Sequence, residues 1–270
     1  PAVEGERLAE NIFVPVDIAD PAVIRLAARL AMAKGGNVLV GAIAAGPGEL
    51  DDARARAREG ELVASAVGAE ASSIVRVDTS AAAAIEAIVA EHGVTLVLTG
   101  WRRSALAADV VLGGQHAELV AIADVPVLTV LTAGADYRRV VLAFDEDDIG
   151  GHAAERDLAV ALAGIAASGA RGRAVVIAPS DEVARDVAAQ VGEDTEAIGD
   201  GRSRREALAA LAREDDLVLV PARPGGSPLH RDALALASLP VDCTVAVPAR
   251  AHSVSALVTG TPTLVGSRAG

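Results

Sequence analysis

The chain has 270 residues, of which 51% are apolar and 23% are charged. This composition excludes a disordered chain and leaves enough apolar surface for two domains of ordinary size. The formal net charge is −13, neither half is basic, and only two Phe, one Trp and one Tyr are present, which argues against a nucleic-acid partner. The single cysteine, Cys243, excludes an internal disulfide, and no apolar run is long enough to cross a bilayer. We therefore expect a cytoplasmic protein with no direct membrane insertion.

Short apolar runs alternate with longer stretches rich in Ala, Leu, Glu and Arg, a pattern that predicts a parallel sheet with helices on its faces. In the first half the expected strands are Ile12–Val16, Val38–Ile43, Ile74–Val77, Val94–Thr99 and Pro126–Leu131. The expected helices are Ala22–Ala33, Leu50–Val67, Ala81–His92 and Gln115–Ile122. Asp20-Pro21 and Gly35 mark the ends of the first helix, as an N-cap acid followed by proline and a C-terminal glycine.

The second half repeats this order. Its expected strands are Val140–Phe144, Ala174–Ile177, Thr195–Ile198, Leu217–Val220 and Cys243–Val247. Its expected helices are His152–Ala167, Glu182–Val191, Ser203–Arg213 and Asp232–Ala237. The acidic run Asp145–Asp148 lacks the ligand spacing of a calcium loop, and we interpret it as a solvated acidic turn.

The two halves also match residue by residue. Asn11–Asp17 aligns with Arg139–Asp145. Thr95–Thr99 aligns in the same way with Asp216–Val220. We therefore predict an α/β protein of two tandem flavodoxin-like, doubly wound domains, each with a five-stranded parallel sheet and about four helices, packed as a pseudo-dimer. The predicted domains are 9–133 and 137–249, followed by a tail over 250–270.

Two strand ends in the first half have the residues expected beside a ligand. In open parallel sheets, ligands bind beyond the carboxyl ends of the strands, where the strand order reverses. The first strand ends at Asp17, and the fourth is followed by Gly100, Arg102 and Arg103. Gly113-Gly114 then precedes a predicted helix, whose free N–H groups would face an anion. This combination favours a phosphate group.

The same loop resembles that of the universal stress proteins. The family's fingerprint is Gly, two residues, Gly, nine residues, Gly, then Ser or Thr. Here the corresponding positions are Gly100, Arg103, Gly113 and Gly114, so the spacing is kept and two residue types differ. Val14–Asp17 is also typical of the family. The resemblance covers roughly residues 9–249 and is to two such domains in one chain.

The resemblance implies an adenine-nucleotide site in the first half. Asp17 would lie near ribose and adenine, the backbone at Val38 would contact adenine, and the loop from Gly100 to Gly114 would surround the phosphates. The ligand could be ATP (with or without Mg²⁺), AMP, cyclic AMP or cyclic di-AMP. The full set of expected contact residues is Pro15, Val16, Asp17, Val38, Gly100, Trp101, Arg102, Arg103, Gly113, Gly114 and Gln115.

The second half departs further from the fingerprint. Asp145 keeps the strand-end acid, but Pro221 and Pro224 stand where Gly100 and Arg103 stand in the first half. Proline removes a backbone donor and fixes φ, so we expect the second half to have lost its phosphate loop. It would then replace the second subunit of a family homodimer.

The predicted function is a non-catalytic regulatory module that senses an adenine nucleotide. The alternative is a structural or interaction module with both sites lost, since degenerate tandem copies resemble cytosolic tails or companions of bacterial cation/proton antiporters and amino-acid transporters. A homodimer of the whole chain is a further expectation. No lysine follows a glycine-rich loop and no nucleophile–His–acid spacing is recognisable, so weak ATP hydrolysis is the least favoured alternative. The five histidines are far apart and predict no metal site.

Overall fold

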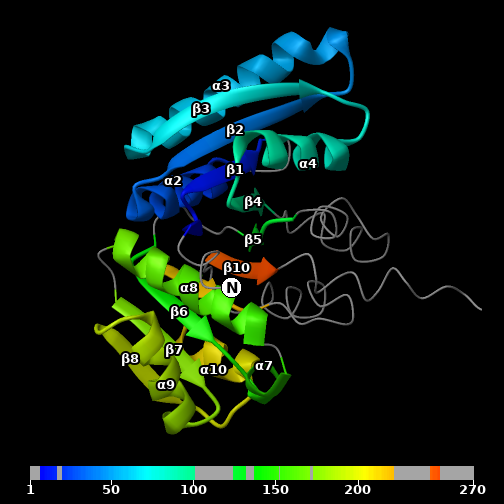
Figure 1. The fold of residues 1–270 in the computed structure, drawn as a ribbon. Helices are drawn as coiled ribbons and strands as arrows, with labels where there is room; N and C mark the ends of the chain where they lie inside the picture. The colour runs from blue at the N-terminus through cyan, green and yellow to red at the C-terminus, as the bar shows by residue number, and fades with distance from the viewer. Residues whose placement is uncertain are drawn as a thin grey trace, which may run out of the picture.

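The structure is a computed structural model that describes residues 7–16, 20–100, 124–131, 137–151, 153–170, 173–221 and 244–249. Within these residues a single sheet of ten strands runs through the molecule (Figure 1). The strands of the first half are β1 (Asn11–Pro15), β2 (Asn37–Ala44), β3 (Glu70–Val77), β4 (Leu96–Gly100) and β5 (Val127–Leu131). Those of the second half are β6 (Arg139–Ala143), β7 (Arg173–Ala178), β8 (Thr195–Gly199), β9 (Asp216–Leu219) and β10 (Thr244–Ala249).

The helices of the described residues connect these strands. In the first half they are α2 (Pro21–Lys34), the short 3₁₀ helix η1 (Pro47–Glu49), α3 (Leu50–Val67) and α4 (Ala81–His92). In the second half they are α7 (Glu146–Gly151), α8 (Ala153–Ala170), α9 (Asp181–Val191) and α10 (Arg204–Leu211). Asp20 caps α2 by accepting from the Ala22 and Val23 N–H groups, and Gly35 ends that helix in the left-handed conformation, as the sequence predicted.

The two halves share one strand order. The sheet runs β3-β2-β1-β4-β5-β10-β9-β6-β7-β8, and β5 pairs with β10 antiparallel while every other neighbouring pair is parallel. Ile12 lies opposite Leu96 in the first half, as Val140 lies opposite Leu217 in the second. The α/β, doubly wound fold predicted from the sequence is confirmed.

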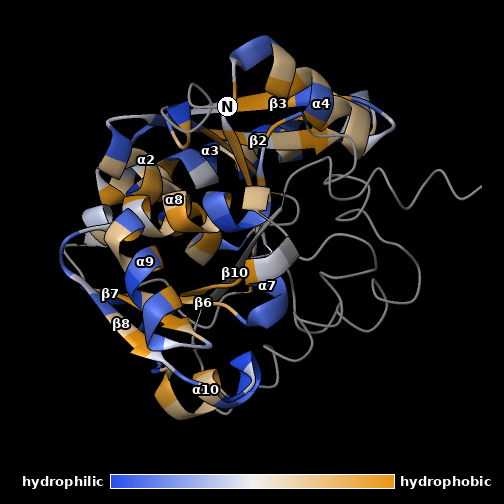
Figure 2. Ribbon diagram, turned by 60° about the horizontal axis from the view of Figure 1, so that its bottom comes forward, coloured by the Kyte–Doolittle hydropathy of each residue, from blue (hydrophilic) through white to orange (hydrophobic). Residues whose placement is uncertain are grey.

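Helices cover both faces of the sheet and create two apolar layers. The larger layer includes side chains of α2, α8 and α9, and the smaller one includes side chains of α4 and α10. Figure 2 shows mainly hydrophobic strands and helices with a hydrophilic outer side. Alternating side chains of a strand point to opposite faces, which explains why Ile12 belongs to the first layer and Phe13 to the second.

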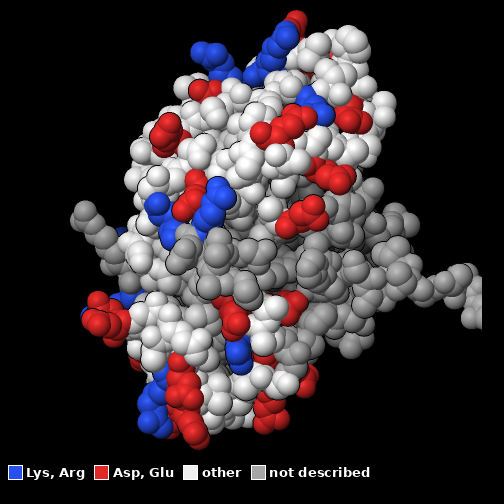
Figure 3. Space-filling view, viewed as in Figure 1, with Lys and Arg blue, Asp and Glu red and all other residues white. Residues whose placement is uncertain are grey.

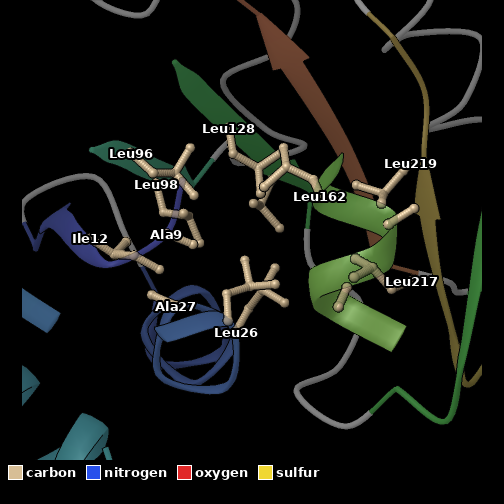
Figure 4. Packing of buried hydrophobic residues seen from close by; sticks show 14 of the residues in the cluster. Ala9, Ile12, Leu26, Ala27, Leu96, Leu98, Leu128, Leu162, Leu217 and Leu219 are labelled. Atoms are coloured by element: carbon tan, nitrogen blue, oxygen red, sulfur yellow. The ribbon is translucent and has the colours of Figure 1, made fainter. Parts of the chain in front are cut away.

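The larger apolar layer continues across the junction between the halves. Leu26 on α2 and Leu162 on α8 are buried in the same cluster, together with Leu128 and Leu217 from the sheet (Figure 4). The two helices approach closely, since a Cβ built on Gly169 would lie 3.0 Å from the Arg29 carbonyl oxygen. The halves therefore share one core instead of having separate ones.

Tyr137, at the start of the second half, strengthens this junction. Its hydroxyl donates to the Ala166 carbonyl of α8 at 3.3 Å, and the Arg29 guanidinium of α2 lies 5.5 Å from the centre of its ring. The side chain is buried, and desolvation raises the pKa of its hydroxyl to about 12, against the smaller opposing effect of Arg29. The ring thus joins α2 of the first half to α8 of the second.

The structure corrects one interpretation and extends one strand. The run Asp145–Asp148 is not a solvated turn: residues 146–151 form helix α7, and Asp148 is only 2% exposed. Strand β3 begins at Glu70, four residues before the expected start, because it pairs with β2 along its full length. Among the described residues, no helix combines the length and apolarity needed to span a bilayer.

Candidate functional site

The strand order reverses between β1 and β4, and this point is the expected ligand position in such a sheet. From β1 the chain proceeds to β2 and β3 on one side and then returns to β4 and β5 on the other. Pro15 and Gly100 are the last residues of the two adjacent strands. The Val16 N–H donates to the Gly41 carbonyl at 2.8 Å, which ties the end of β1 to β2. Three of the expected contact residues thus lie at one edge of the sheet.

Val38 does not lie at this edge. It is the second residue of β2, is fully buried, and pairs with Ile12 and Ala71 near the amino ends of the strands. The carboxyl end of β2 is formed by Ile43 and Ala44. The structure therefore brings Pro15, Val16 and Gly100 together and leaves Val38 several residues away along β2.

The other expected contacts lie outside the described residues: Asp17, Trp101, Arg102, Arg103, Gly113, Gly114 and Gln115. Their flanking positions are defined. Asp17 falls between Val16, at the end of β1, and Asp20, the N-cap of α2. Trp101 follows Gly100 directly. The segments after Val16 and after Gly100 therefore both begin at the point where the strand order reverses.

Helix α3 fixes the position of Val16. A Cβ built on Gly60 would lie 2.9 Å from Val16 Cγ1 and 2.6 Å from Val40 Cγ1. Only glycine permits this close approach of the helix to the end of β1 and the middle of β2 without displacing one of them. The backbone that leads to Asp17 is consequently supported from one face of the sheet.

The corresponding edge of the second half contains a buried ion pair. Arg204 Nη1 lies 2.6 Å from Asp148 Oδ2 and 4.0 Å from Asp145 Oδ2. The Arg204 side chain is 6% exposed and that of Asp148 is 2% exposed. Pro221, which stands where Gly100 stands in the first half, is buried beyond the end of β9.

Sequence reasoning missed this pair, although one local signal was available. Asp145 and Asp148 have the three-residue spacing of a capping box: the Asp145 N–H donates to Asp148 Oδ2, and the Asp148 N–H donates to Asp145 Oδ1. That spacing predicts a helix start at residue 146. The pairing with Arg204 has no local signal, because 56 positions separate the two residues.

Acidic and basic side chains are mixed on the face of the molecule that Figure 3 shows. In Figure 3, Asp and Glu side chains lie next to Arg side chains, with no extended basic area on this face. Among the described residues no group of three His, Cys, Asp or Glu side chains is arranged to hold a metal ion.

Comparison with known proteins identifies the fold. No protein-family model and no curated protein sequence matches the chain. A universal stress protein from Archaeoglobus fulgidus DSM 4304 superposes with a TM-score of 0.57 at 17% identity, over 89% of this chain and 96% of that chain. The chain has the fold of the universal stress proteins.

Two further solved structures share this universal-stress-protein fold. A Pseudomonas aeruginosa PAO1 protein of unknown function superposes with a TM-score of 0.59 at 16% identity, over 93% of this chain and 96% of that chain. The cytoplasmic domain of a prokaryotic cation chloride cotransporter superposes with a TM-score of 0.60 at 13% identity, over 91% of this chain and 96% of that chain. At these identities the likeness establishes the fold.

Proposed function

We propose that the chain is a non-catalytic regulatory module of universal-stress-protein type that binds an adenine nucleotide in its first half. The observation that carries the proposal is that Pro15 and Gly100 end neighbouring strands, and Val16 follows one of them, where the strand order reverses. Ligand and loop would meet there. The domains 9–133 and 137–249 would act as the binding half and its fused partner.

The residue types in the segments that follow Val16 and Gly100 suit a nucleotide. Asp17 would accept hydrogen bonds from ribose hydroxyls, and the loop from Gly100 to Gly114 would place main-chain N–H groups and the guanidinium groups of Arg102 and Arg103 around phosphate. Arg103 stands where the family fingerprint has glycine, so the phosphate position would differ from that of the family's ATP. AMP, cyclic AMP and cyclic di-AMP are therefore tested beside ATP with Mg²⁺.

The route from ligand to partner would run through α2. Its N-cap Asp20 lies three residues after Asp17, and α2 packs against α8 through Arg29 and Tyr137. A ligand that reorders residues 17–19 would change the start of α2 and hence the junction between the halves. This gives the nucleotide a physical means of altering a surface that a partner contacts.

Titration of the purified chain tests the proposal. Trp101 is the single tryptophan and lies in the proposed loop, so binding is expected to change its fluorescence and to release or absorb heat. Asp17→Ala is expected to weaken binding at least about tenfold, which corresponds to roughly 1.4 kcal/mol. Asp51→Ala, at an exposed site on α3, is the control and should bind as the wild type does.

Two results would count against this function. If none of the four nucleotides changes fluorescence or heat, the chain is not a nucleotide sensor. If ATP is hydrolysed steadily, and the turnover disappears in Asp17→Ala, the chain is an enzyme instead of a regulatory module.

A second candidate is a partner domain of a membrane transporter that functions without nucleotide. The full-length superposition on the cytoplasmic domain of a cation chloride cotransporter supports it. In that case the tagged chain should retain a transporter from detergent-solubilised membranes of its own cells. Retention should be equal with and without nucleotide and unchanged in Asp17→Ala.

A further inference from the structure

The start of α10 differs in one decisive residue from the start of the equivalent helix, α4. Ser80 caps α4 by accepting from the Ala83 N–H, and Ser203 caps α10 by accepting from the Glu206 N–H. The strand before each helix also ends alike: the Asp78 N–H donates to the Ala44 carbonyl, and the Asp200 N–H donates to the Ala178 carbonyl. The first helical residue is consequently Ala81 in one half and Arg204 in the other.

Arg204 reaches the acids that follow β6. Its guanidinium lies 2.6 Å from Asp148 Oδ2, and that oxygen also accepts from the Asp145 N–H at 2.9 Å. Asp145 in turn accepts from the Asp148 N–H at 3.2 Å. One arginine from α10 therefore holds the reciprocal cap that joins the end of β6 to α7.

Two energetic costs oppose a buried arginine at the start of α10. A cation in the first turn of a helix opposes the helix dipole, and burying a guanidinium is unfavourable without a charged partner. The capping box between Ser203 and Glu206 already satisfies the start of α10, and the Ser203 hydroxyl and N–H lower the pKa of the Glu206 carboxyl. The contact with Asp148 is what makes an arginine favourable at position 204.

We propose that Arg204, in addition to the prolines that replace the phosphate loop of the second half, restricts ligand binding to the first half. Asp145 is the counterpart of Asp17, and Arg204 places an internal cation within 4.0 Å of its carboxylate. A nucleotide entering the second half would have to displace a buried ion pair before its ribose could reach that acid. In the first half the first residue of the equivalent helix is Ala81, which carries no charge. This inference rests on the proposed function, because it specifies which of two equivalent edges is used.

A reciprocal exchange tests the inference. Ala81→Arg should bring a guanidinium to Asp17, the counterpart of Asp145. We expect it to weaken nucleotide binding at least about tenfold, a change of roughly 1.4 kcal/mol. Ala83→Arg adds the same charge two residues later, at an exposed position, and should bind within about twofold of the wild type, or roughly 0.4 kcal/mol. Thermal melts of both variants establish that they are folded. Arg204→Ala should lower the melting temperature and leave nucleotide binding in the first half unchanged.

The outcomes separate the inference from the function on which it depends. If the wild type binds and folded Ala81→Arg binds equally well, the inference is wrong and the proposed function stands. If wild type binds two nucleotides per chain, Arg204 does not close the second half and the inference is again wrong. If wild type binds none, the proposed function fails, and the restriction to one half fails with it.

Discussion

The two halves place the same strands in the same register and differ in the charges at the strand ends. At the carboxyl ends the first half has Ala81 at the start of α4, and the second half has Arg204 paired with Asp148. The fold is therefore compatible with either arrangement. The comparison shows that one edge of this sheet contains an internal ion pair from a helix start, whereas the equivalent helix of the other half starts with an uncharged residue.

The amino ends of the strands show the same contrast. In the first half the Asn11 N–H donates to the Thr95 hydroxyl at 3.0 Å. At the equivalent place Arg139 donates to both carboxylate oxygens of Asp216, at 2.8 and 2.6 Å, and to the Leu211 carbonyl. The paired Asp216 raises the pKa of the Arg139 guanidinium further above its ordinary value. A neutral pair in one half is thus a partly buried ion pair in the other.

Removing this ion pair should produce the largest loss of stability. Asp216→Ala leaves a guanidinium without its carboxylate partner beside a fully buried position, and we expect a cost of about 3–5 kcal/mol in urea-induced unfolding. Thr95→Ala, at the matching place in the first half, removes two neutral hydrogen bonds between the hydroxyl and the Asn11 backbone and should cost about 1–2 kcal/mol. Equal costs for the two variants would contradict the comparison of the amino ends.

A cavity at the junction should weaken both halves together. Leu162 of α8 is buried in the cluster that also contains Leu26 and Leu128 of the first half, so Leu162→Ala is expected to cost about 3 kcal/mol. Because the core is shared, the fluorescence of Trp101 and the far-ultraviolet circular dichroism should report one urea transition. Two separate transitions would mean that the halves unfold as independent domains.

The buried hydroxyl of Tyr137 predicts a smaller loss of stability that depends on pH. The pKa of the Tyr137 hydroxyl is about 12 in the folded chain, against a model-peptide value near 10. Between these values the unfolded chain loses the phenolic proton and the folded chain keeps it. Stability should therefore fall as pH rises, by about 2–3 kcal/mol in total across that window.

The absorbance of the phenolate measures this directly, because Tyr137 is the single tyrosine. Its ionisation should have a midpoint near 12, and Tyr137→Phe should remove its share of the stability loss above pH 10. A midpoint near 10 would show that the ring is hydrated and does not hold the two helices together.

Local signals predicted most of the fold. Ser80 and Gly93 bound α4, and Ser203 begins α10, because caps act on the residues next to them. Helix α7 was missed since its acidic run has no apolar period, and the burial of Asp148 depends on Arg204, which is remote in sequence. The amino-end position of Val38 was already implied by the expected strand Val38–Ile43, and only the family resemblance placed this residue at the ligand.

The central claim is that a nucleotide binds at the carboxyl edge of the first half and not of the second. Native mass spectrometry of the intact chain with ATP, AMP, cyclic AMP and cyclic di-AMP counts bound ligands directly. The account predicts one adduct per chain for at least one of these nucleotides, and its loss in Asp17→Ala. Two adducts per chain, none with any of the four, or one that survives Asp17→Ala would contradict it.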